Sequence, residues 1–169
     1  LKNKKNLRII DSSSLNKINL NLISSNINSY LLQTSDNFSF LKSNFKVVSK
    51  IKPSYKTLKN LLFAFNICRF VKSNAIVLAN KDTTIGIGSG QSSRLDSCEI
   101  AIKKMKKFYK EKEDDEIIAA SDAFFPFVDG IEKLIQSGVS AIIQPSGSIR
   151  DKEIIKFANR TNTILVFSK

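Results

Sequence analysis

The residue types best suited to binding a ligand occur together in residues 122–129. Residues 124–127 read Phe-Phe-Pro-Phe, with Asp122 before them and Asp129 soon after. Core aromatic residues usually recur at strand or helix spacing, so such a run on a loop is typical of a wall that holds a flat ring. Both carboxylates could accept hydrogen bonds from an amino-substituted heterocycle, or Asp129 could be only the N-cap of the next helix.

Two further segments have the composition of ligand-binding loops. Residues 86–94 read Gly-Ile-Gly-Ser-Gly-Gln-Ser-Ser-Arg, in which glycines could let the backbone approach a ligand and a helix start could bind an anion. A plain glycine turn is an equal alternative. In residues 144–151, Ser148 and backbone N–H groups could hold a carboxylate or phosphate. Alternatively, Ser148 and Asp151 form a capping box.

Several kinds of chemistry are excluded by composition. The chain contains no histidine, so it holds neither a Ser-His-Asp triad nor a His-ligated metal. Its two cysteines, Cys68 and Cys98, are too few for a four-cysteine zinc site, and no zinc site is expected. Both lie in apolar helical patterns, which predicts that they pack as small hydrophobic residues.

The charge is concentrated near the N-terminus. The whole chain has a net charge of +12, and residues 1–60 hold 11 basic and 2 acidic side chains. A nucleic-acid-binding arm is one interpretation and a solvated lysine-rich surface is the other. Because lysine outnumbers arginine 22 to 5, specific base recognition, and hence a nucleic-acid partner, is disfavoured. No apolar run is long enough to cross a membrane, and no signal peptide is expected.

The elements that position these segments follow from hydrophobic spacing. Residues 1–45 form a weakly patterned Asn/Ser/Lys-rich lead-in, irregular over residues 11–28, with short strands predicted at 7–10, 29–33 and 45–49. From Pro53, expected in the first helical turn, one helix face carries apolar residues. This face comprises Leu58, Leu61, Leu62, Phe65 and Cys68. A hairpin of residues 74–79 and 83–87 follows, and then a helix to about residue 110.

The remaining chain alternates strands and helices. Strands are predicted at residues 117–120, 139–143 and 164–167, with helices at 129–136 and 151–159. This order predicts a three-layer α/β fold for residues 46–169: a hairpin plus a mainly parallel sheet flanked by helices. Ligands bind such sheets beyond the carboxyl ends of the strands, where the three loops fall. Zinc nucleobase deaminases share this layout, but their Pro-Cys-x-x-Cys motif is absent here.

Four segments together resemble the C-terminal part of the AICAR transformylase family. They are residues 70–75, 85–94, 121–127 and 144–151, in the order and at about the spacing of the family. The resemblance is strongest from about residue 46 to 169. It implies that this chain is the second of two cytidine-deaminase-like subdomains. It also implies transfer of a formyl group from 10-formyltetrahydrofolate to the 5-amino group of AICAR, in a bifunctional purine-biosynthesis protein that also contains IMP cyclohydrolase.

The resemblance also implies roles for individual residues. Asn74 matches an active-site asparagine beside the reacting amine and carbonyl, where it could also donate to the developing oxyanion. The positions that match the folate and AICAR pocket are Arg94, Leu95, Phe124, Pro126, Asp129 and Ser148. Ser73 and Asp122 match positions where some members hold a monovalent cation such as K⁺. A homodimer and a cytoplasmic location are expected from the same resemblance.

The chain also departs from the family pattern. The essential Lys-His pair of the family belongs to the preceding subdomain, its usual arginine after Phe127 is Val128 here, and its basic C-terminal tail follows the point where this chain stops. We therefore expect an incomplete fragment that is inactive alone. Two alternatives stay open, namely a basic nucleic-acid module using residues 1–60 and a non-catalytic folate- or nucleotide-binding domain.

Overall fold

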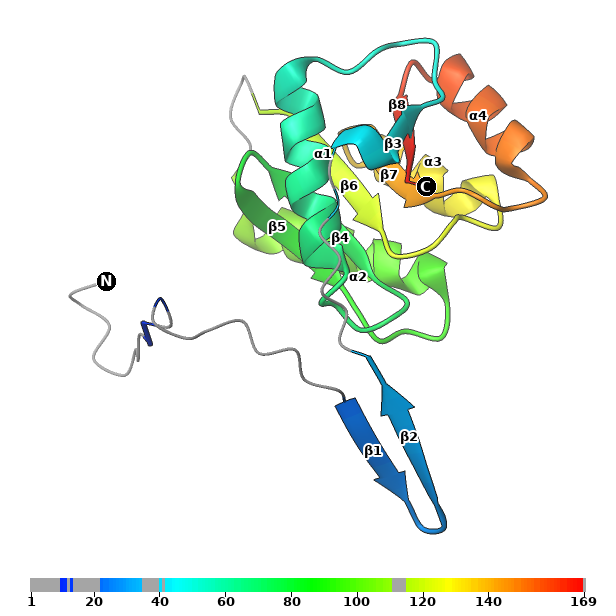
Figure 1. Cartoon of the computed structure of the whole chain (residues 1–169). Helices are drawn as coiled ribbons and strands as arrows, with labels where there is room; N and C mark the ends of the chain where they lie inside the picture. The colour runs from blue at the N-terminus through cyan, green and yellow to red at the C-terminus, as the bar shows by residue number, and fades with distance from the viewer. Residues whose placement is uncertain are drawn as a thin grey trace. The chain divides into compact units, whose positions relative to one another are not determined.

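The computed structural model describes residues 10, 11, 13, 22–34, 40, 42–110 and 115–168 (Figure 1). The chain divides into two compact units, Leu1–Phe38 and Ser39–Lys169. Among the described residues, no helix has the length and apolar character needed to cross a membrane.

The smaller unit contains one antiparallel hairpin. Strand β1 (Leu22–Asn26) pairs with β2 (Ser29–Gln33), and every residue of both strands is exposed. The prediction for residues 29–33 is confirmed. The prediction that residues 11–28 are irregular is wrong at β1. Leu22–Asn26 has no alternating apolar pattern of its own, and it is a strand because it pairs with β2. Of the strand predicted at residues 7–10, only Ile10 is described, and it has no regular structure.

The larger unit is built on a six-stranded sheet in the order β3-β8-β7-β6-β4-β5. The strands are β3 (Phe45–Val47), β4 (Ile76–Asn80), β5 (Thr83–Gly88), β6 (Ile117–Ser121), β7 (Val139–Pro145) and β8 (Ile164–Ser168). Strands β6, β7 and β8 are parallel, whereas β4 pairs antiparallel with β5 and β6, and β3 pairs antiparallel with β8. The predicted hairpin followed by a parallel sheet is confirmed. Strand β3 adds an antiparallel edge strand to this sheet, next to β8.

Helices cover both faces of this sheet, which makes three layers (Figure 1). Helix α1 (Tyr55–Cys68) packs on one face, where Leu61, Phe65 and Cys68 join the core with alternate residues of the strands. Helices α2 (Arg94–Phe108), α3 (Val128–Gln136) and α4 (Asp151–Arg160) cover the other face. The three-layer α/β prediction is confirmed, and alternation of side chains along each strand explains how one sheet supplies both cores.

Two helix starts differ from the predictions. Helix α1 begins at Tyr55, and the Ser54 side chain caps it by accepting from the Thr57 N–H, so Pro53 lies before the cap rather than in the first turn. Helix α4 is preceded by Arg150 without a side-chain cap. The expected capping box is wrong, because Ser148 Oγ accepts from the Arg150 N–H and Asp151 accepts from the Gly147 N–H.

Candidate functional site

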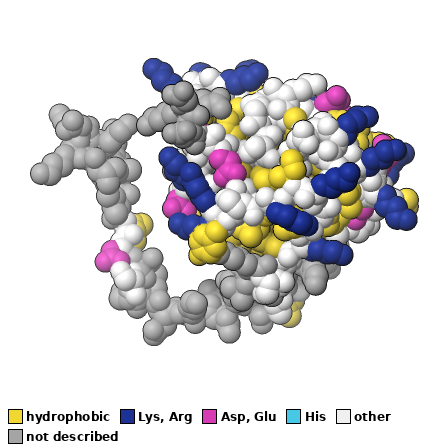
Figure 2. Space-filling model, turned by 90° about the horizontal axis from the view of Figure 1, so that it is seen from above, with side chains coloured by type: hydrophobic (Ala, Val, Ile, Leu, Met, Phe, Trp, Pro, Cys, Tyr) yellow, Lys and Arg dark blue, Asp and Glu magenta, His cyan; other side chains and the backbone are white. Residues whose placement is uncertain are grey.

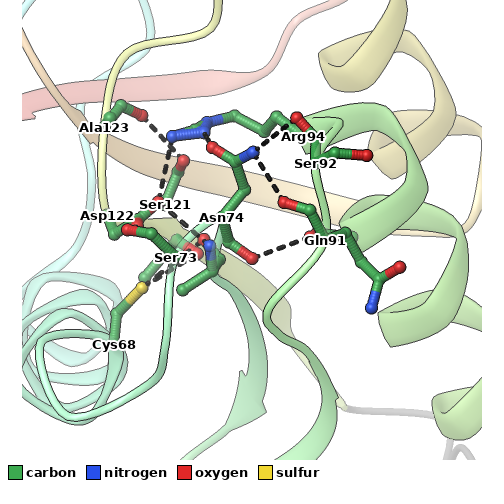
Figure 3. Close-up of polar contacts among 12 residues, drawn as sticks. Cys68, Ser73, Asn74, Gln91, Ser92, Arg94, Ser121, Asp122 and Ala123 are labelled. Carbon is green, nitrogen blue, oxygen red and sulfur yellow. Dashed lines mark hydrogen bonds and ion pairs between the residues drawn. The ribbon is translucent and has the colours of Figure 1, made fainter.

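The predicted loops converge at one edge of the sheet. Strand β6 ends there at Ser121 and β5 at Gly88, whereas β4 begins there at Ile76, and the pairing places these three residues next to one another. The segments 73–75, 89–94 and 122–127 therefore leave the sheet at neighbouring positions. Figure 3 shows the side chains of Asn74, Arg94 and Asp122 directed toward one another, with the backbone of Gln91 beside Asn74.

Asn74 lies at the centre of this group and is fixed at both ends of its amide. Its Nδ2 donates to the carbonyl oxygens of Gln91 at 2.9 Å and Ser92 at 3.1 Å. Its Oδ1 accepts from Arg94 at 2.6 Å, and its backbone carbonyl accepts from the Ser97 hydroxyl at 2.7 Å. Both Nδ2 hydrogens are thus used, while Oδ1 keeps one lone pair for a further donor.

Arg94 and Asp122 form a nearly buried ion pair behind Asn74. The distance from Arg94 Nη2 to Asp122 Oδ1 is 3.0 Å, and the two side chains are only 10% and 12% exposed. Asp122 also accepts from the Ala75 N–H and from the Ser73 hydroxyl. The Arg94 Nε–H is buried and has no acceptor among the described residues. One guanidinium therefore holds two acceptors from separate loops in fixed positions.

A pocket of about 580 Å³ opens beside this network. Residues of three separate loops and two helix starts line it, including Asn74, Arg94, Leu95, Phe124, Pro126 and Asp129. Phe124 and Phe127 are 39% and 51% exposed, whereas Phe125 is 1% exposed and belongs to the core. The phenylalanine segment thus provides two rings to the pocket and one anchor beneath it.

Asp129 lies on the pocket as an exposed carboxylate in the first turn of α3. Its Oδ1 accepts from the Gly130 N–H at 2.7 Å. The N-cap position is Phe127, so the N-cap interpretation of Asp129 is wrong. A carboxylate in the first turn is favoured by the positive end of the helix dipole and keeps acceptor capacity for a ligand.

Ser148 does not line this pocket, although its loop touches the phenylalanine wall. The Arg150 guanidinium lies 4.7 Å from the centre of the Phe127 ring. This cation–π contact joins the loop after β7 to the loop after β6. Val128 faces a different groove, between α3 and α4, with Lys152 and Lys156.

The glycine segment serves packing more than ligand approach. A Cβ atom on Gly88 would lie 1.8 Å from the Ser97 carbonyl oxygen, and one on Gly86 would lie 2.2 Å from the Ala101 carbonyl oxygen. These glycines let α2 pack directly on β5. Gly90, with a φ of +69°, provides the turn before α2. For the glycines of residues 86–94, the structure favours a role in packing and turning over a role in ligand approach. The carbonyls of Gln91 and Ser92 in the same segment bind Asn74.

Residues outside the sequence prediction complete the site. The carbonyls of Gln91 and Ser92, the Ser97 hydroxyl and Gly130, which leaves room for the Phe125 ring, all shape the pocket. Backbone carbonyls carry no sequence signal, so their role could be found only once the loops were placed in space. No group of three or more His, Cys, Asp or Glu residues in the described part of the chain is placed to hold a metal ion.

The chain matches one family and several of its members. The family profile described as "AICARFT/IMPCHase bienzyme" matches residues 1–104, so the match includes the basic N-terminal segment. A "Bifunctional purine biosynthesis protein PurH" of Buchnera aphidicola subsp. Schizaphis graminum is 42% identical, with 100% of this chain and 32% of that protein aligned. Proteins of the same name from Caldicellulosiruptor bescii and Persephonella marina are 42% and 41% identical over 98% of this chain. This chain spans about a third of the length of these relatives.

Proposed function

The chain belongs to the AICARFT/IMPCHase bienzyme family, and from this premise we propose that it forms part of a formyltransferase of purine biosynthesis. The reaction moves the formyl group of 10-formyltetrahydrofolate to the 5-amino group of AICAR. A C–N bond to the amine forms, the bond to the folate nitrogen breaks, and one proton passes from the amine to that nitrogen. The enzyme must hold the two substrates together and exclude water, since water would accept the formyl group instead.

The observation that carries this proposal is the state of the Asn74 amide. Because Nδ2 is committed to two backbone carbonyls, the free lone pair of Oδ1 is the group that Asn74 offers to a ligand. An amine N–H is a suitable partner, so we assign to Asn74 the orientation of the attacking amine rather than donation to an oxyanion.

The phenylalanine wall supplies the second requirement. Phe124, Pro126 and the Phe127 ring present apolar surface along the pocket, which suits a pterin ring and keeps water from the formyl carbon. Asp129 lies on the same pocket and could accept from the amino group of the pterin. Ser148 would act from the neighbouring loop. Because Ser148 does not line the pocket, it would contact only a part of the folate that extends past the phenylalanine side chains.

The monovalent cation proposed for Ser73 and Asp122 has suitable chemistry. A hydroxyl and a carboxylate are hard oxygen donors, which K⁺ prefers, and their side chains already contact each other. Asp122 is engaged on both oxygens, so the ion would share it with Arg94 and Ala75. Its contribution would be to fix the segment that carries Asn74. The proton relay, the homodimer and the cytoplasmic location proposed for the enzyme depend on the longer protein.

The test is an Asn74→Ala substitution in the complete enzyme. We expect kcat to fall by about 100-fold, because the amine loses its orientation, while the circular dichroism spectrum is retained. Asn159→Ala is the matched control, since Asn159 accepts from the Lys50 N–H and lines a different groove. A wild-type kcat in the Asn74→Ala enzyme would remove Asn74 from the mechanism. Folate binding without any transfer in the wild-type enzyme would favour a non-catalytic binding domain.

A further inference from the structure

Phe127 is the less enclosed of the two phenylalanine rings that line the pocket. It is 51% exposed, compared with 39% for Phe124. It occupies the N-cap position before α3, where its backbone is extended with a φ of −143°. The backbone fixes the point from which the ring projects but leaves its side-chain rotamer open. A wall whose ring can rotate binds a flat ligand less tightly, since binding must then order the ring.

The guanidinium of Arg150 lies against this ring. Its carbon atom is 4.7 Å from the centre of the Phe127 ring, within the range of about 6 Å over which a cation is attracted to an aromatic face. Arg150 Nη1 also donates to Glu153 Oε2 at 3.1 Å. The guanidinium is therefore held by a carboxylate as well as by the ring, which limits the positions that it can take.

The backbone of Arg150 is fixed by the start of α4. Its carbonyl accepts from the N–H groups of Glu153 at 2.9 Å and Ile154 at 3.0 Å. Its own N–H donates to the Ser148 hydroxyl at 3.1 Å. Ile154 is fully buried in the core, so this end of α4 is anchored to the sheet. Arg150 thus contacts the phenylalanine wall from a fixed helix start.

We propose that Arg150 is a positioning residue for folate binding, which holds the Phe127 ring in the orientation that packs against the pterin. This inference rests on the proposed function. Charge alone does not distinguish Arg150, because Lys and Arg side chains are spread over the face of the larger unit seen in Figure 2. Its contact does: the other cation–ring contacts of the described residues involve Phe70, Phe108 and Phe157, which do not line the pocket.

The effect of such a contact falls on folate affinity. A ring that already has its binding orientation loses less freedom when the ligand arrives, so the ligand binds more tightly. Arginine suits this role because its planar guanidinium stacks on an aromatic face, whereas the ammonium of lysine is a compact point charge. Loss of the contact should therefore raise the KM for folate without changing the chemical step.

The first test is Arg150→Met in the complete enzyme, which keeps a long side chain and removes the cation. We expect the KM for 10-formyltetrahydrofolate to rise about threefold, while kcat, the KM for AICAR and the circular dichroism spectrum are retained. Arg150→Lys should restore only part of the folate affinity. An unchanged folate KM in Arg150→Met would overturn the inference.

Arg160→Met is the matched control. Arg160 lies at the other end of α4, 5.1 Å from the centre of the Phe157 ring, and lines the groove beside α4 rather than the pocket. The same substitution there should leave the folate KM unchanged. An equal rise in both variants would show a general effect of lost positive charge and would also overturn the inference.

A double-substitution cycle separates positioning from direct contact with the ligand. Phe127→Leu removes the ring and should itself raise the folate KM. If Arg150 acts through the ring, Arg150→Met should add nothing further in the Phe127→Leu enzyme. If the two increases multiply, Arg150 acts on the folate itself and the inference is wrong. A wild-type enzyme that transfers no formyl group would instead refute the proposed function.

Discussion

Asp122 organises the polar side of the site through contacts that are distant in sequence. It accepts from Ser73, Ala75 and Arg94, which are separated from it by 49, 47 and 28 positions. Sequence reasoning could select Asp122 as a hydrogen-bond acceptor next to a phenylalanine run. It could not show that the carboxylate is largely occupied within the protein, because that depends on where β4 and β6 place their ends.

The two cysteine thiols give a prediction at the residue scale. Burial raises the pKa of Cys68 and of Cys98 to about 12, from an ordinary value of 9.0. At pH 8 both thiols are protonated and enclosed, so a thiol reagent should modify neither cysteine in the folded protein and both in urea. Mass spectrometry of the two cysteine peptides measures this. Rapid labelling of either cysteine without denaturant would contradict the burial.

The same pKa shifts predict the sign of a pH effect on stability. The unfolded chain releases thiol protons above pH 9, whereas the folded protein retains them to about pH 12. The contribution of the thiols to the free energy of unfolding is therefore complete below pH 9 and decreases as pH rises through this window. A Cys68→Ala, Cys98→Ala protein provides the control, since its unfolding should lose this part of the pH dependence.

At the scale of elements, the contact between β5 and α2 is the one most sensitive to a single atom. In Gly88→Ala, the new methyl group would meet the Ser97 carbonyl oxygen, so α2 must move. We expect the free energy of unfolding to fall by about 3 kcal/mol. In Gly90→Ala the new methyl group would meet no atom, but alanine would have to adopt the unfavourable positive φ of Gly90. We expect this variant to lower the free energy of unfolding by about 1 kcal/mol. Urea denaturation distinguishes the two. Equal losses for both variants would contradict the packing role.

The elements themselves were largely predictable, and the reasons differ for those that were not. Buried strands such as Ile117–Ser121 and amphipathic helices such as Val128–Gln136 have strong local patterns. β1 has none, since its Ser24 and Ser25 interrupt the apolar residues and only pairing with β2 defines it. For the glycines of β5, the sequence indicates ligand approach or a turn, because it cannot show that a helix backbone lies against them.

At the scale of the whole molecule, the described pocket provides orientation more clearly than proton transfer. The chain has no histidine, the side chain that most readily exchanges a proton near neutral pH. Asp122 is paired with Arg94, which leaves Asp129 as the exposed carboxylate of the pocket. Relatives about three times as long provide ample chain for a proton acceptor outside the part seen here.

We expect folding and catalysis to be separable in this protein. The purified 169-residue chain should unfold cooperatively in urea, because the larger unit has complete cores on both faces of its sheet. It should transfer no measurable formyl group at saturating AICAR and 10-formyltetrahydrofolate, whereas the complete enzyme should turn over under the same conditions. If the chain alone does turn over, the proton acceptor lies within it, and Asp129→Asn identifies it: loss of turnover in that variant assigns the role to Asp129. Retained turnover would show that transfer here needs neither a histidine nor this carboxylate.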